Sequence, residues 1–262
     1  MTNRENIIND FYNNYDEDSR LTRTNHDRVE FITTTHYIDR FLRPGMRILE
    51  VGAGTGRYSL HYARLGYQVD AIDFVQHNID VLQSNVEQGM NITAQQGDAL
   101  DLSRFADGTF DVTLVLGPLY HLYTEQDQDR AIAEAIRVTR PGGIVAIAYL
   151  TSDSIMVDWA LDDHHLITAQ NTDFDENFRI INTEEGVFAA FYINEFCQMM
   201  GNHNITFLHN VATDGLSHHI RDRIDALPEE EFEIWVRYHL STCERIDLQG
   251  YSNHMLYICR RN

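Results

Sequence analysis

The stretch LEVGAGTGRYS, residues 49–59, decides the fold. Three glycines, Gly52, Gly54 and Gly56, alternate with other residues directly after the apolar run MRILEV and directly before a helical pattern. Glycine adopts left-handed backbone angles without steric cost and lets a ligand approach the main chain closely. A strand, a glycine turn and a helix in this order are typical of a ligand-binding turn in an α/β fold.

The segments around this turn alternate between strand and helix patterns. The expected strands are 46–51, 67–73, 91–96, 110–117 and 144–150, and the expected helices are 56–65, 75–88 and 124–138. We expect RPGG at 140–143 to end the last helix and open a turn. Such alternation predicts a doubly wound, mostly parallel sheet with helices on both faces, whose ligands lie beyond the carboxyl ends of the strands.

The flanking segments break this rhythm. Residues 1–45 predict an N-terminal helical cap, and 46–262 predict the main domain. Residues 151–192 are rich in acids, histidine and aromatics, and read as an insertion that forms either a lid over a substrate or a small core of its own. A helix at 193–201, a strand at 205–215, a helix at 228–246 and a strand at 254–260 complete the chain.

Composition excludes several classes of protein. The chain has 262 residues, 43% of them hydrophobic, and a formal net charge of −20; all 20 basic residues are arginine. This charge repels phosphate backbones, so we expect no nucleic-acid partner. The sequence shows neither a long apolar run nor an apolar signal region, which predicts a cytoplasmic protein that does not cross a membrane. The three cysteines lack the spacing of a zinc site or a disulfide framework.

The glycine spacing does not fit a dinucleotide. The dinucleotide fingerprint GxGxxG would place a third glycine where Arg57 or Ser59 stands. Glu50, just before the turn, would repel a diphosphate and attract a cation. S-adenosylmethionine carries a sulfonium and an ammonium but no phosphate, so it is favoured over a nicotinamide cofactor.

The ends of the later strands offer partners for the rest of that cofactor. Asp73 can accept hydrogen bonds from ribose hydroxyls, and Phe74 can lie against an adenine face. Asp98 can accept from the adenine amine, while the Ala99 amide donates to the ring. The backbone at Leu116 can hold the methionine ammonium.

Five motifs, ILEVGAGTG, AIDF, GDALDL, FDVTLVLG and RVTRPGG, occur in this order. Over residues 40–150 the chain resembles the class I S-adenosylmethionine-dependent methyltransferases of the small-molecule type. The resemblance implies a Rossmann-like sheet of seven strands, with 205–213 and 254–260 as two further strands, one of them antiparallel. It implies a methyltransferase that uses S-adenosylmethionine. The expected cofactor-binding residues are Glu50, Gly52, Ala53, Gly54, Gly56, Asp73, Phe74, Asp98, Ala99 and Leu116.

The resemblance also implies that the N-terminal segment closes over the cofactor. Tyr15 and Arg20 are then cofactor-binding residues, and Arg20 can clamp the methionine carboxylate through two hydrogen bonds. The alternative is a solvated arginine on an acidic segment.

The methyl acceptor is less well defined by sequence. Transfer from a sulfonium is an in-line displacement, for which proximity and alignment supply much of the acceleration and a base is optional. The sequence GPLY at 117–120 departs from the Asn/Asp-Pro-Pro-Tyr signature of enzymes that methylate planar amino groups. GPLYHL instead resembles a motif of small-molecule methyltransferases, which places Tyr120 at the pocket wall and makes His121 the candidate base. Alternatively, His121 packs beneath the loop and only shapes it.

The remaining histidines do not predict a metal site. Adjacent side chains diverge in helices and strands, so the pairs His164–His165 and His218–His219 are poor chelators of one ion. We therefore expect methyl transfer to a small molecule without a metal. The alternatives are a methyltransferase acting on protein or RNA, and a non-catalytic S-adenosylmethionine-binding protein. The acceptor, the methylated atom and the oligomeric state stay open.

Overall fold

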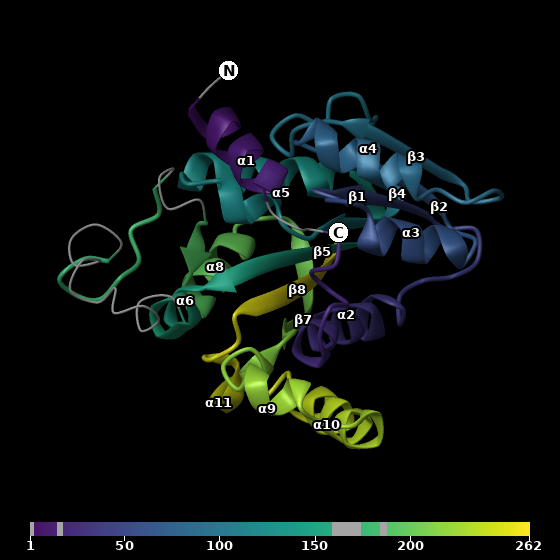
Figure 1. Cartoon of the computed structure of the whole chain (residues 1–262). Coiled ribbons are helices and arrows are strands. Elements are labelled where there is room, and N and C mark those ends of the chain that lie inside the picture. Colours follow the sequence, from purple (N-terminus) through teal and green to yellow (C-terminus); the bar gives the residue numbers. More distant parts are fainter. Residues whose placement is uncertain (1–2, 15–17, 159–173, 184–187) are drawn as a thin grey trace.

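The computed structural model describes residues 3–14, 18–158, 174–183 and 188–262 (Figure 1). Its strands are β1 (Arg47–Val51), β2 (Gln68–Asp73), β3 (Ile92–Gln96), β4 (Phe110–Val115), β5 (Thr139–Thr151), β6 (Ala190–Phe191), β7 (Ile205–Ala212) and β8 (His254–Arg261). They form one sheet in the order β3-β2-β1-β4-β5-β8-β7, with the two-residue β6 paired to β5. β8 runs antiparallel to both of its neighbours, and the other pairs are parallel. The predicted doubly wound, seven-stranded fold is confirmed, with β6 as an addition.

The order of the strands positions the site. The chain passes outward from β1 to β2 and β3, and then returns to pair β4 with the other side of β1. In this register Val51 of β1 lies opposite Ile72 of β2 and Val115 of β4. The turns after β1, β2 and β4 therefore open at one edge of the sheet, at the switch point where such folds bind ligands.

The described helices cover the sheet and its ends. They are α1 (Asn3–Asn14), α2 (Asn25–Ile38), α3 (Arg57–Arg64), α4 (Gln76–Ser84), α5 (Glu125–Val138), α6 (Ser152–Asp158), α8 (Ile193–Met200), α9 (Arg221–Asp225), α10 (Glu229–Thr242) and α11 (Ile246–Gln249), with short 3₁₀ turns η1 (Pro118–His121) and η4 (Gly215–Ser217). Threonines begin two of the helices: the hydroxyls of Thr24 and Thr124 accept from the amides of Asp27 and Asp127. None of the described helices is long and apolar enough to cross a membrane.

The segment at 140–143 differs from the prediction. α5 ends at Val138 as expected, but β5 begins at Thr139 and includes the RPGG sequence instead of leaving it as a turn. The register with β4 shifts between Phe110 and Val112, and Gly142 has a φ of +77°. Glycine tolerates that angle, so the strand continues through an irregularity in the pairing that the sequence pattern does not reveal.

Residues 1–45 contain two helices with different roles. α2 packs against α9 and α10, where Val29 joins an apolar cluster with Phe232 and Val236. At its other end Tyr37 and Ile38 belong to the main core. Figure 1 shows α2 beside the lower helices, while α1 lies apart from it near the top of the molecule. The expected cap therefore divides into a helix built into the core and a helix over the site.

Candidate active site

A cavity of about 740 Å³ opens at the carboxyl edge of the sheet. Its walls come from α1, from the residues before and within α2, from the turns after β1 to β5 and β7, and from the start of β8. Both apolar and charged side chains line it. This volume lies within the range of sites that hold small molecules and cofactors.

The glycine turn shapes one end of this cavity. Gly52, Gly54 and Gly56 have φ angles of +75°, +53° and +92°. Gly52 and Gly54 line the cavity, whereas Ala53 and Gly56 do not. A Cβ on Gly56 would lie 2.4 Å from Cγ of Leu82, so this glycine is required by the packing of α3 on α4. Gly52 and Gly54 thus face the cavity, and Gly52 and Gly56 are both required by packing, since a Cβ on Gly52 would lie 2.6 Å from Cδ of Pro118.

Asp73 lies beside the turn and is nearly saturated with hydrogen bonds. Its Oδ2 accepts from the amide of Gly54 at 2.8 Å, and its Oδ1 accepts from the amide of Val75 at 2.9 Å and from the side chain of Asn78 at 3.1 Å. Burial raises the pKa of this carboxyl. A carboxylate has about four acceptor sites. Asp73 therefore offers one further site to a ribose hydroxyl, and a second would require Gly54 to move.

Glu50 lies behind the turn instead of at the cavity surface. It is buried, is absent from the cavity lining, and accepts a hydrogen bond from the Ser59 hydroxyl. Burial raises its pKa to about 8. At neutral pH the carboxyl is largely protonated, so its attraction for a cation is weaker than its sequence position suggests.

The expected adenine partners are brought together, but with an unexpected neighbour. Phe74, Asp98 and Ala99 all line the cavity, as does Leu116, which was expected to hold the methionine ammonium. Arg4 of α1 donates to Asp98 at 3.0 and 3.4 Å and lies 5.0 Å from the ring centre of Phe74. Arg4 therefore holds two groups that an adenine would use. A single arginine in a polar helix gives no signal from which sequence reasoning could have found it.

The residues expected to clamp the methionine carboxylate are only partly described. Tyr15 lies outside the described residues. Arg20 lines the cavity and donates to both carboxylate oxygens of Glu30, at 2.9 and 3.4 Å. The clamp stays a prediction, in which a cofactor carboxylate would compete with Glu30.

Tyr120 and His121 both lie on η1 and line the cavity. The Nε2 of His121 hydrogen-bonds the Tyr12 hydroxyl of α1 at 2.9 Å, and Phe188 tilts against the imidazole with ring centres 5.3 Å apart. Burial raises the pKa of Tyr120 well above its usual value, so this phenol stays neutral. The geometry agrees with Tyr120 as a wall and leaves the role of His121 as a base a prediction.

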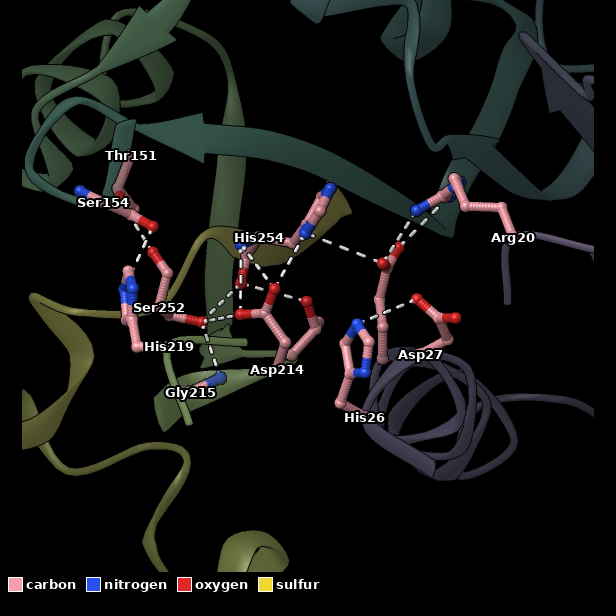
Figure 2. A network of polar contacts seen from close by, with 12 residues as sticks. Arg20, His26, Asp27, Thr151, Ser154, Asp214, Gly215, His219, Ser252 and His254 are labelled. Atoms are coloured by element: carbon pink, nitrogen blue, oxygen red, sulfur yellow. Dashed lines mark hydrogen bonds and ion pairs between the residues drawn. The ribbon is translucent and has the colours of Figure 1, made fainter. Parts of the chain in front are cut away.

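A polar network that sequence reasoning missed lies at the far end (Figure 2). Nδ1 of His254 lies 2.8 Å from Oδ2 of Asp214 and 3.6 Å from Oε2 of Glu30, which pairs with Arg20. Asp214 follows β7 and His254 begins the antiparallel β8, so adjacent strands bring them to one edge. The two strand patterns were visible in the sequence, but their pairing was not.

The insertion contributes to the wall of the cavity. Ile155, Ile180, Ile181 and Phe188 line it, and Phe188 packs edge-on against Phe11 of α1 at 5.2 Å. Residues 159–173 and 184–187, which include His164 and His165, lie outside the described residues, so the role as a lid stays a prediction. His218 lines the cavity, whereas Nε2 of His219 bonds Ser154. Within the described residues no three His, Cys, Asp or Glu side chains gather as a metal site.

The sequence matches known methyltransferases over the cofactor-binding part. Residues 48–143 match the family model of a methyltransferase domain. A demethylmenaquinone methyltransferase of Streptomyces avermitilis is 37% identical over 142 residues, 54% of this chain and 57% of the relative. A ubiquinone biosynthesis O-methyltransferase of Caulobacter vibrioides is 33% identical over 107 residues, 40% of this chain and 41% of the relative. The chain spans about half the length, or less, of these curated relatives.

The fold matches solved structures over nearly the whole chain. A protein of Pyrococcus horikoshii superposes with a TM-score of 0.60 at 13% identity, covering 97% of this chain and 99% of that one. A methyltransferase of Methanosarcina mazei described as S-adenosylmethionine-dependent gives 0.55 at 18% identity, covering 86% and 96%. The cofactor-binding part of the chain, residues 48–143, thus matches a methyltransferase domain, and the fold is shared with a structure described as an S-adenosylmethionine-dependent methyltransferase.

Proposed function

We propose that this chain transfers a methyl group from S-adenosylmethionine to a small-molecule acceptor. The observation that carries the proposal is one continuous cavity that joins the glycine turn to a second end lined by Leu150, Ile155 and Phe188. Two substrates can therefore meet inside one cavity. The named relatives support a small acceptor, since one is a demethylmenaquinone methyltransferase and the other a ubiquinone biosynthesis O-methyltransferase.

The residues of the first end fit the donor. The backbone of Gly52 and Gly54 lets the ligand approach, and Asp73 has one acceptor site for a ribose hydroxyl. Phe74 offers a ring face and Asp98 offers a carboxylate to the adenine once Arg4 no longer contacts them. The bound donor supplies a methyl group activated by its sulfonium. The protein supplies position and excludes water, which for a good leaving group accounts for much of the rate.

Titration calorimetry tests the donor. S-adenosylmethionine and S-adenosylhomocysteine should bind, and NAD should not. Asp73→Ala should weaken binding about tenfold to a hundredfold, because a hydrogen bond to a charged group contributes about 1.5–3 kcal/mol.

Asp70→Ala is the matched control, since Asp70 also lies on β2 but pairs with Arg47 and does not line the cavity. Binding of NAD, or equal affinity in the Asp73 and Asp70 variants, would contradict the proposed cofactor site.

A further inference from the structure

Asp214 and His254 form a hydrogen-bonded pair at the second end of the cavity, which we call the acceptor end. Besides its 2.8 Å contact with Nδ1 of His254, Asp214 accepts from the Ser252 hydroxyl at 2.6 Å and from the backbone amide of His254 at 3.2 Å. The carboxylate is 4% exposed, so these contacts fix its position. Figure 2 shows the His254 ring extending away from this cluster, with its second nitrogen at the far end.

This arrangement selects one tautomer of the imidazole. Since a carboxylate only accepts, Nδ1 of His254 must carry the hydrogen. The lone pair of the neutral ring then lies on Nε2. Among the residues that the structure describes, none hydrogen-bonds this nitrogen, and the ring lines the cavity. Nε2 of His254 is therefore a proton acceptor that faces the cavity.

The surrounding charges suit a base that becomes a cation. Burial alone would raise the pKa of Asp214, but the hydrogen bond and charge of His254, helped by His218 and Ser252, hold it at about 2. Asp214 thus stays ionised and stabilises a protonated ring. Glu30 also faces Nδ1 at 3.6 Å, but Arg20 neutralises it. The ring of Tyr120 also lies beside the His254 ring, in an edge-to-face arrangement with the two ring centres 5.9 Å apart.

We propose that His254, oriented by Asp214, is the general base for a hydroxyl-bearing acceptor, an inference that rests on the proposed function. Nε2 of His254 takes the proton from the acceptor hydroxyl. The electron pair that this releases, on the oxygen or on a conjugated carbon, forms the bond to the methyl group. The methyl–sulfur bond breaks and its electron pair stays on sulfur, giving S-adenosylhomocysteine. Asp214 accepts a hydrogen bond throughout and is a positioning residue.

The chemistry of the acceptor follows from the need for a base. A neutral amine already carries the electron pair that attacks a methyl group, whereas a phenol or enol attacks effectively only as its proton leaves. The same cavity adds apolar side chains at Leu150, Ile155 and Phe188. The predicted acceptor is therefore a hydroxylated ring or enol with an apolar body. His121 is less suited to this role because its Nε2 already bonds Tyr12.

Nitrogen NMR of histidine-labelled protein tests the pair without donor or acceptor. Neutral His254 should be the Nδ1–H tautomer, and Asp214→Asn should shift it toward the mixed population of a free imidazole. His209 is the matched control, since its Nδ1 bonds Glu244 at 2.7 Å and it does not line the cavity; Glu244→Gln should alter His209 but leave His254 unchanged. An Nε2–H tautomer at His254 in the unmodified protein would overturn the assignment.

The coloured anion of 4-nitrophenol tests the substrate class. At a pH where free nitrophenol is mostly neutral, the unmodified protein should bind it as the yellow phenolate. His254→Gln should bind it as the neutral phenol, and His209→Gln should behave like the unmodified protein. Nitrophenol that fails to bind, or that binds without ionising, would overturn the hydroxyl-acceptor class. Calorimetry with S-adenosylmethionine on the same samples separates this failure from a failure of the proposed function.

Discussion

The two ends of the cavity are built in different ways. At the donor end, Gly52 follows β1, Asp73 ends β2 and Asp98 lies two residues after β3, so the sheet itself brings them together. At the acceptor end, Glu30, Asp214 and His254 come from α2, from the turn after β7 and from the start of β8. The donor end depends on contiguous motifs, and the acceptor end depends on long-range pairing. The predictions below test whether this difference holds in energetic terms.

The largest expected effect concerns the buried acid behind the glycine turn. The folded-state pKa of Glu50 is raised to about 8, so its contribution to stability is fully present below its unfolded pKa and is lost as pH rises toward 8. The free energy of unfolding should fall by about 4 kcal/mol over this range. Urea unfolding at several pH values should show a flatter profile for Glu50→Gln. An unchanged slope would mean that Glu50 is ionised in the folded protein.

The next largest effect is expected at Gly56, where the glycine turn of the donor end packs against Leu82. Gly56→Ala adds a Cβ within 2.4 Å of Leu82 at a φ of +92°, which should cost about 3 kcal/mol through overpacking and strain. Gly66→Ala is the control, because Gly66 has a φ of +87° but open space around its Cβ. Its cost should be about 1 kcal/mol. Equal losses for both variants in urea unfolding would remove the packing role.

The acceptor end should respond to pH in the opposite direction. The pKa of Asp214 is lowered to about 2, so its stabilising contribution is present above its unfolded pKa and is lost as pH falls through about 2. We expect Asp214→Asn to lose about 2 kcal/mol at neutral pH and to unfold with a weaker dependence on acid. Acid titration followed by circular dichroism measures both. A variant as acid-sensitive as the unmodified protein would assign the acid transition to other carboxyls.

The smallest effect concerns the helix over the donor end. Arg4→Ala should raise the affinity for S-adenosylmethionine severalfold, because Asp98 and Phe74 no longer have to exchange a guanidinium for the adenine. Arg64→Ala is the control, since Arg64 pairs with Glu87 outside the cavity lining. Calorimetry decides the sign. Weaker binding in Arg4→Ala would show that Arg4 contacts the bound cofactor instead of competing with it.

The sequence predicted the fold, and it placed most of the expected donor residues along one cavity, for a physical reason. Strand, turn and helix signals are local, and parallel strands bring Asp73 and Asp98 to the same edge once the order of elements is known. The burial of Glu50 could not be predicted in this way, because a residue on β1 can face either the ligand or the core. Asp214 and His254 are 40 positions apart and meet only through the register of β7 and β8. No local pattern reports that contact.

The position of α1 has a consequence for the order in which the two substrates are handled. Arg4 contacts Asp98 at the donor end and also donates to the backbone oxygen of His121 at 3.1 Å, while Tyr12 of the same helix hydrogen-bonds the ring of His121. The helix is therefore held to η1 through His121 at two positions, one of which is Arg4. Adenine that displaces Arg4 would also release one of these two contacts. The donor is then expected to act as the first substrate in a compulsory-order mechanism, admitting the acceptor only after the helix has tilted.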